Sequence, residues 1–182
     1  MKNAGLRFSV EIARIDEEMV RASLIAESAT PRDIADVLAE MKAQKISEKH
    51  PEALVIGCDQ VLDIEGDMLS KPETPQIAVE QLKRLQNKRH SLLSAIVICK
   101  EGKPVWRHIG QVRMHMRALS DGFIESYVSR NWESIRHSVG AYKLEEEGVS
   151  LFSRVEGDYF NVLGMPVLEL ISYLILSGEL QQ

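Results

Sequence analysis

The chain has 182 residues, of which 27% are charged and 45% hydrophobic, and its formal net charge is −5 at pH 7. At roughly 150 residues per domain this length predicts one compact domain, and the apolar fraction is too high for a disordered chain. The negative balance disfavours a partner such as a nucleic-acid polymer, because binding it requires neutralising many phosphates. A few clustered lysines or arginines could still hold a small anion.

The two cysteines, Cys58 and Cys99, lie in apolar runs, where buried thiols are common, and neither has the ligand spacing of a zinc site. The first ten residues lack the apolar core of a signal peptide, and the longest apolar stretch, residues 165–176, is too short to span a bilayer. The sequence therefore predicts a cytoplasmic protein in a reducing compartment, with no membrane as partner.

Residues 6–15 alternate apolar and polar side chains, which predicts a half-buried strand that ends at the acidic cluster of residues 16–18. Taken alone, that cluster is typical of a solvated turn. Thr30 and Pro31 then supply an N-cap and a proline at the first helical position. A helix is expected to about Lys49, with an apolar face at helical spacing: Ile34, Val37, Leu38 and Met41.

Residues 53–58 form a continuous apolar run that predicts a buried strand, and residues 61–69 contain Glu65-Gly66, which favours a hairpin turn. Thr74-Pro75 repeats the cap and proline signal and predicts a helix that stops near Asn87.

Two β-rich segments, residues 90–100 and 105–118, flank a turn-like connection and predict an antiparallel pair. Ser120 can cap the next helix, and Pro166 can open a final helix that is apolar almost all round. Residues 137–166 hold four glycines among aromatic and acidic residues, which favours an irregular backbone near a pocket or a loop-rich structural segment. The elements together predict an α/β fold with helices covering a mixed sheet.

The candidate chemistry lies in carboxylates and lysines, because the five histidines lack metal-ligand spacing and no nucleotide-binding or hydrolase motif occurs. Asp59 and Gln60 directly follow the predicted buried strand, where ligands are often bound, although an aspartate there is also typical of a turn. Lys42 flanks the apolar face of its helix and is expected to lean toward the protein body, as is Lys45 unless it snorkels to solvent from the end of the helix. Lys71 precedes a proline, so its backbone is expected to be extended and could direct the ammonium into a cleft, although taken alone a solvated surface lysine is the more usual interpretation.

Taken together, eight segments resemble the Maf family of nucleoside triphosphate pyrophosphatases in order and spacing: AGLRF, RIDEE, VLAEMKA, VIGCDQVL, SKP, RALSDGFIESYV, VGAYKLEEEG and VEGDYFNVLGMP. The resemblance implies an α/β fold of the Maf or inosine triphosphate pyrophosphatase type, with a mixed twisted sheet and a nucleotide cleft between two lobes. It also implies hydrolysis of a modified or noncanonical nucleoside triphosphate to the monophosphate and pyrophosphate, with a divalent cation, Mg or Mn, as cofactor.

By the same resemblance, Asp59 would be the general base, and Glu17 with Asp59 would hold the metal. Lys42 and Lys71 would clamp the phosphates, and Gln60 would contact the substrate. These roles agree with chemistry, because a triphosphate attracts cations and an attacking water needs a proton acceptor.

The resemblance also bears on substrate choice through Lys143 and Glu145. Family members that act on dTTP and UTP typically carry a glutamine where this chain aligns Glu145. Those that prefer 7-methyl-GTP share the pattern of a lysine, one spacer and a glutamate. Lys143 and Glu145 therefore favour a purine whose donor edge a carboxylate can accept.

One departure from the family concerns the N-terminus, where members carry a strand and a phosphate-binding loop of the type ASxSPRR ahead of AGLRF. Residues 1–182 are therefore expected to form a single Maf-like domain without that strand and loop. The rival interpretation is a nucleotide-binding or partner-binding regulator without turnover, linked to septum formation. A homodimer is the expected assembly, since most oligomers are symmetric.

Overall fold

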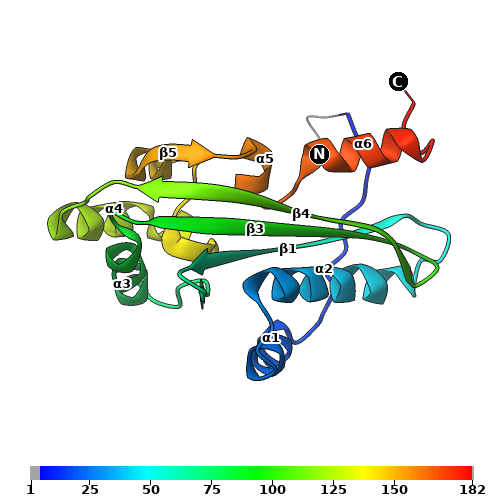
Figure 1. Cartoon of the computed structure of the whole chain (residues 1–182), viewed down its shortest axis with the longest axis horizontal. Helices are drawn as coiled ribbons and strands as arrows, with labels where there is room; N and C mark the ends of the chain where they lie inside the picture. The colour runs from blue at the N-terminus through cyan, green and yellow to red at the C-terminus, as the bar shows by residue number, and fades with distance from the viewer. Residues whose placement is uncertain (1–4, 182) are drawn as a thin grey trace.

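A computed structural model describes residues 5–181 and contains a five-stranded sheet in the order β2-β1-β3-β4-β5 (Figure 1). The strands are β1 (Val55–Ile64), β2 (Asp67–Leu69), β3 (Arg89–Lys100), β4 (Lys103–Met116) and β5 (Phe152–Glu156). The predicted α/β class with helices flanking a sheet is confirmed. All pairings among the described residues are antiparallel, so the expected mixture of strand directions is not found there.

Both predicted hairpins are present, and each turns at a Glu-Gly pair with positive φ angles. The φ angles are 58° and 91° at Glu65-Gly66, and 52° and 72° at Glu101-Gly102. This backbone matches the twist of the strands that it joins, which is why two-residue turns of this kind are favoured in hairpins. The sequence predicts a strand over residues 53–58 that ends before Asp59 and Gln60. This prediction is wrong, because β1 runs without interruption from Val55 to Ile64.

Helix α2 (Pro31–Ser47) covers one face of β1 and β3, as predicted from its cap and its spacing. Thr30 caps it in a capping box with Asp33. Its small residues allow a close approach to the sheet: a Cβ built on Gly57 would lie only 2.3 Å from the carbonyl oxygen of Ala39 and 2.8 Å from the Cβ of Ala43. The glycine therefore sets the distance between the helix and the strand that carries Asp59.

The other face of the sheet is covered at its two ends by different helices. Helix α6 (Val167–Leu176) packs on Ile96 and Ile98 of β3. Helices α3 (Pro75–Leu85) and α4 (Asp121–Ile135) pack on the same face nearer Leu92, since alternate residues of a strand share a face. None of the helices within residues 5–181 is long and apolar enough to cross a bilayer.

The predicted strand over residues 6–15 is wrong, because this segment has no strand pairing and runs along the surface beside α2. Val10 and Ile12 are 81% and 78% exposed, so the alternating pattern does not mark a buried face. A strand needs a neighbouring backbone for its hydrogen bonds, and this segment is instead tied down by side chains of α2 and the residues after it. Lys45, expected to lean toward the protein body, is exposed and donates a hydrogen bond to the carbonyl oxygen of Arg14.

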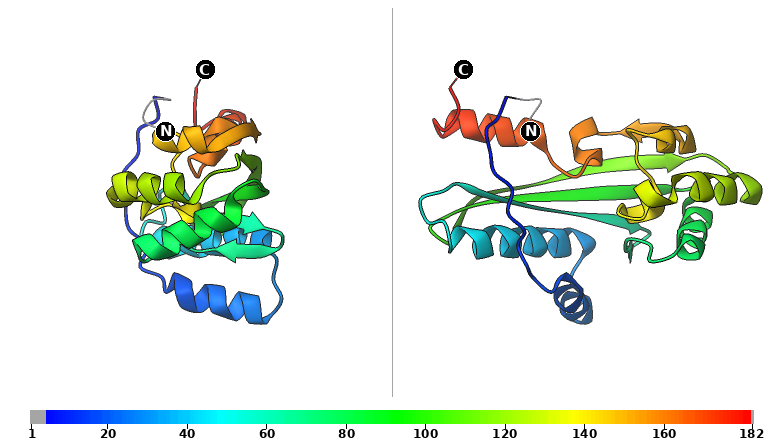
Figure 2. Two further views of the ribbon diagram at one scale, coloured as in Figure 1. Left: turned by 90° about the vertical axis from the view of Figure 1, so that its left-hand side faces the viewer. Right: turned by 180° about the vertical axis from the view of Figure 1, so that it is seen from behind.

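The acidic cluster interpreted as a turn instead begins helix α1 (Glu17–Ala26). Asp16 is its N-cap and accepts a hydrogen bond from the backbone of Met19, and two glutamates occupy the first turn. Negative charge at this end of a helix is stabilised by the helix dipole. No residue of α1 is buried, and α1 forms the outermost layer beyond α2 (Figure 2).

The glycine-rich segment after α4 is irregular, as predicted, but it also holds short elements that were not predicted. These are the 3-10 helices η2 (Val139–Ala141) and η3 (Glu147–Leu151), strand β5 and helix α5 (Tyr159–Val162). Gly140 has a φ of +76° and packs so closely on the sheet that an added Cβ would lie 2.5 Å from Leu62. Only glycine meets both requirements there.

Candidate active site

A pocket of about 640 Å³ lies at the open edge of β1. Strand β2 pairs only with residues 62–64 of β1, so residues 55–61 have no neighbouring strand on that side among the described residues. Asp59 and Gln60 point to opposite faces of the sheet, yet both line the pocket, because it wraps around this edge. Their place is the middle of an edge strand and not, as expected, the end of one.

Side chains from three elements meet at one lysine beside the pocket. The ammonium of Lys42, from α2, lies 2.8 Å from Asp59 Oδ1 of β1 and 2.9 Å from Glu17 Oε1 of α1. The prediction that Lys42 leans toward the protein body is confirmed, since its side chain is only 20% exposed. Lys42 bridges the two carboxylates and is not among the residues that line the pocket.

The environment of Asp59 favours its protonated form. Burial raises the pKa of this carboxyl above its ordinary value, the charge of Glu17 raises it further, and Lys42 and Arg21 oppose the rise. Burial by itself lowers the pKa of Lys42, but the two carboxylates more than offset this and hold it above its ordinary value. Asp59 is therefore a carboxylate that readily accepts a proton, next to a lysine that keeps its own.

The two carboxylates also fit a divalent cation. Asp59 Oδ2 is buried and has no hydrogen-bond partner in the described part of the chain, which leaves one oxygen available beside Glu17. No group of three or more potential metal-ligating side chains occurs within residues 5–181. Magnesium is commonly held by one or two carboxylates together with substrate phosphates, so two are sufficient for that ion.

Lys71 lines the pocket from the segment after β2, which has no regular secondary structure. Arg21 of α1 and His137 line it as well, and sequence reasoning missed both. Arg21 follows Glu17 by four residues, so the two share one face of α1. Helical spacing after the acidic cluster was the signal that would have revealed Arg21.

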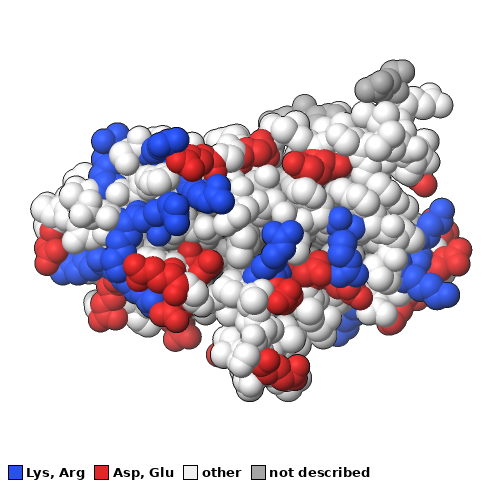
Figure 3. Space-filling view, viewed as in Figure 1, with Lys and Arg blue, Asp and Glu red and all other residues white. Residues whose placement is uncertain are grey.

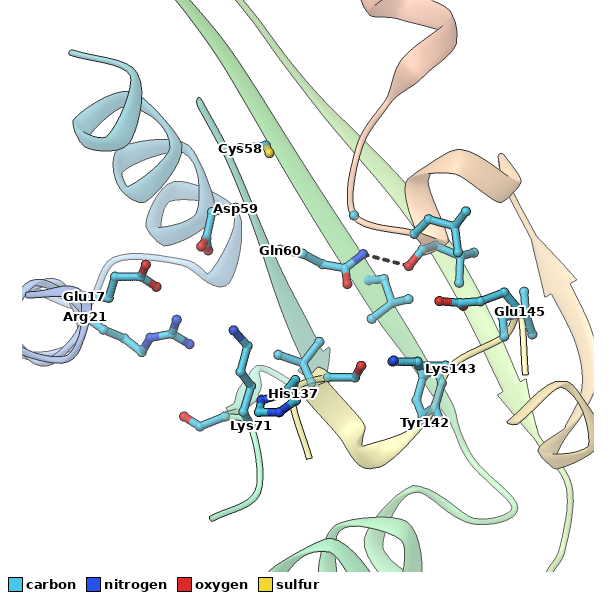
Figure 4. A pocket seen from close by; sticks show the side chains of 18 of the residues that line it. Glu17, Arg21, Cys58, Asp59, Gln60, Lys71, His137, Tyr142, Lys143 and Glu145 are labelled. Carbon is cyan, nitrogen blue, oxygen red and sulfur yellow. Dashed lines mark hydrogen bonds between the residues drawn. The ribbon is translucent and has the colours of Figure 1, made fainter. Parts of the chain in front are cut away.

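The side chain of Gln60, the residue after Asp59 on β1, is held in one orientation by hydrogen bonds. Its Nε2 donates to Ser94 Oγ at 2.9 Å and to the carbonyl oxygens of Asn161 and Val162 at 2.8 and 3.2 Å (Figure 4). The side-chain oxygen is thereby turned away from these backbone acceptors and toward the cavity. Gln60 offers a hydrogen-bond acceptor to a ligand in the pocket.

Lys143 and Glu145 also line the pocket, at the end opposite Glu17 and Arg21 (Figure 4). The Lys143 ammonium lies 2.7 Å from Ser134 Oγ and 3.4 Å from Glu146 Oε1, so it already has partners within the protein. The pocket also has apolar lining residues, which are typical of a surface that receives a planar ring: Leu92, Val139, Leu144, Val162 and Leu163.

The structure thus brings all seven predicted site residues together. Six of them line the pocket, and the seventh, Lys42, is bonded to two of these six. Seen from the side of Figure 1, the surface mixes both signs of charge, with Lys and Arg gathering over the left-hand ends of the strands (Figure 3).

Comparison with known proteins gives concordant matches along the chain. The family described as Maf-like protein matches residues 1–176. A nucleoside triphosphate pyrophosphatase of Ruegeria pomeroyi is 62% identical over 98% of this chain and 89% of its own length. One of Roseobacter denitrificans is 63% identical over 99% of this chain and 90% of its own length. A 7-methyl-GTP pyrophosphatase of Brucella abortus is 45% identical over 96% of this chain and 87% of its own length. The chain therefore belongs to the Maf family.

Proposed function

We infer that this protein is a nucleoside triphosphate pyrophosphatase, a hydrolase that converts a nucleoside triphosphate to the monophosphate and pyrophosphate. The observation that carries this inference is a carboxylate with a raised pKa, Asp59, in a pocket that is lined by the cations Arg21 and Lys71 on one side and by the acceptors Gln60 and Glu145 on the other. The names of the relatives support an enzyme over a regulator without turnover.

The proposed reaction is the hydrolysis of a phosphoanhydride bond. Asp59 takes a proton from water, and the water oxygen forms a bond to the α-phosphorus of the substrate. The bond from that phosphorus to the α–β bridging oxygen breaks, and pyrophosphate leaves with the electron pair. The products are the nucleoside monophosphate and pyrophosphate, and the proton returns to solvent from Asp59.

The surrounding residues have distinct proposed roles. Glu17 and Asp59 would hold a magnesium or manganese ion, which when bound would neutralise phosphate charge. Lys71 would bind phosphate oxygens directly. Lys42 would position the two carboxylates, and it would reach a phosphate only by exchanging one of these partners.

For the nucleobase of the substrate we propose a guanine-like ring, as in 7-methyl-GTP. Gln60 and Glu145 present acceptors to the pocket, and the guanine edge carries N–H donors that a carboxylate and an amide oxygen can accept. The name of the Brucella abortus relative supports this choice. Lys143 would hold the segment that carries Glu145, through its contacts with Ser134 and Glu146.

We also propose that the protein acts in the cytoplasm, which its two free cysteines support, since thiols persist in a reducing compartment. The homodimer remains a prediction. Size-exclusion chromatography with light scattering, which measures the molar mass in solution, tests it.

Product identity tests the proposed function. The protein is incubated with magnesium and 7-methyl-GTP, GTP, dTTP or UTP, and the products are separated by ion-exchange chromatography. We expect nucleoside monophosphate and pyrophosphate in equal amounts, formed fastest from 7-methyl-GTP. A nucleoside diphosphate with inorganic phosphate would contradict the proposed bond cleavage, and faster turnover of dTTP or UTP would contradict the proposed base.

A further inference from the structure

Two cations, Arg21 and Lys71, extend into the pocket from opposite walls. Arg21 comes from α1, and Lys71 comes from the segment that follows β2. Figure 4 shows their charged ends pointing toward one another beside Glu17. Like charges repel, and an anion bound between the two groups would relieve that repulsion.

The acidic residues that line the pocket form no ion pair with these two cations within residues 5–181. Glu17 and Asp59 both pair with Lys42, and Glu18 and Glu73 have no salt bridge to Arg21 or Lys71 in that part of the chain. Within residues 5–181, neither Arg21 nor Lys71 forms a hydrogen bond or a salt bridge, whereas Lys143 at the other end has two partners. The N–H donors of Arg21 and Lys71 are therefore available to a ligand.

The place of this pair relative to Asp59 indicates which part of the substrate it meets. Gln60 and Glu145 lie toward the other end of the pocket, where the nucleoside is proposed to bind, and Asp59 lies on the Glu17 and Arg21 side of Gln60 (Figure 4). With the nucleoside at the Glu145 end, the phosphate chain extends toward Arg21 and Lys71.

We propose that Arg21, together with Lys71, binds the β- and γ-phosphates and the pyrophosphate that they become. This inference rests on the proposed function and adds a residue to it, from a helix that the sequence did not predict. A guanidinium suits the task, because its planar fork can donate two parallel hydrogen bonds to phosphate oxygens. It also stabilises the negative charge that develops on the leaving pyrophosphate.

Titration calorimetry with inorganic pyrophosphate and magnesium tests the proposal without requiring turnover. The wild type is compared with Arg21→Ala, Arg21→Lys and a control, Arg32→Ala, which removes an exposed arginine of α2 that does not line the pocket. We expect Arg21→Ala to weaken pyrophosphate binding about tenfold to a hundredfold, Arg21→Lys to restore part of it, and the control to leave it unchanged. Binding of the nucleoside monophosphate should be the same in all four proteins. The melting temperature should change little, since α1 buries no residue.

Pyrophosphate binding of equal strength in the wild type and Arg21→Ala would overturn the role of Arg21. The proposed function fails separately: if the wild type binds pyrophosphate through Arg21 but releases none from any triphosphate, the subsite stands and the reaction does not.

Discussion

Asp59 combines two properties that a general base needs. It lies beside a cavity large enough for a nucleotide, and burial together with Glu17 raises the pKa of its carboxyl above its ordinary value. A base whose pKa is closer to neutral accepts a proton from water more readily. Lys42 and Arg21 limit the rise in this pKa.

A first prediction concerns the pH dependence of turnover. Because the deprotonated carboxylate is the active form, kcat/KM should fall as the pH is lowered through the raised pKa of Asp59, at a pH above the ordinary aspartate value of 3.8. Glu17→Gln removes the like charge and should move this acidic limb to lower pH. The measurement is pyrophosphate release as a function of pH, and an acidic limb that is identical in both proteins would contradict the coupling.

A second prediction concerns Lys71, whose proposed role depends on its charge. Lys71→Ala should lower kcat/KM about tenfold to a hundredfold through lost phosphate binding. It should change the free energy of unfolding by no more than about 0.5 kcal/mol, because the side chain is exposed. The control is Lys103→Ala, an exposed lysine outside the pocket, with unchanged kinetics. A large loss of stability with normal kinetics would make Lys71 a structural residue.

Among the elements, the contact between α2 and β1 positions the pair Lys42 and Asp59. Gly57 permits this contact, since an added Cβ would lie 2.3 Å and 2.6 Å from backbone atoms of Ala39 and Ala43. Backbone atoms cannot rotate out of the way as a side chain can, so a larger residue must push the helix away from the strand.

The third prediction follows from that contact. Gly57→Ala should destabilise the protein by about 1–3 kcal/mol, the usual cost of overpacking, and should lower kcat as Lys42 moves away from Asp59. Gly122→Ala is the matched control: its Cβ would meet nothing within 4 Å, and alanine favours the helix in which it lies. Urea denaturation measures the free energy of unfolding of both variants. Equal stability of Gly57→Ala and the wild type would show that α2 adjusts without cost.

The elements also show where sequence patterns succeed and where they fail. Helices α2, α3 and α4 and the two hairpins carry their signals locally, in caps, prolines and Glu-Gly turns. The segment 6–15 carries a strand pattern, but pairing depends on a neighbour that the local sequence does not specify. Because α1 was interpreted as a turn, the position of Arg21 in the site was missed too. The convergence of Glu17, Lys42 and Asp59 came from the family resemblance, since contacts between distant segments are not encoded in spacing.

On the scale of the whole molecule, a buried histidine links stability to pH. His90 is 2% exposed, its Nε2 lies 2.7 Å from the hydroxyl of Tyr142, and its Nδ1 has no partner in the described part of the chain. Burial, with a smaller contribution from His115, lowers the pKa of His90 to about 4. The folded protein therefore holds this ring neutral under conditions in which the unfolded chain protonates it.

The fourth prediction uses the sign of this shift. Because the folded-state pKa is depressed, the contribution of His90 is fully present above the ordinary value of 6.5 and is lost as the pH falls from there toward 4. Between pH 7 and pH 5 the loss should amount to roughly 2 kcal/mol in the free energy of unfolding. Urea denaturation at both pH values measures it. His90→Gln should lack this part of the pH dependence, while His108→Gln should keep it, and an equal dependence in both variants would contradict the assignment.

We propose that the open edge of β1 is a catalytic site and that Asp59 is its general base. The most direct measurement compares pyrophosphate release from 7-methyl-GTP by the wild type and by Asp59→Asn, a nearly isosteric change that removes the proton acceptor. We predict a loss of at least about a hundredfold in kcat. The melting temperatures of both proteins establish that the variant is folded. Turnover by a folded Asp59→Asn protein at the wild-type rate would contradict the account.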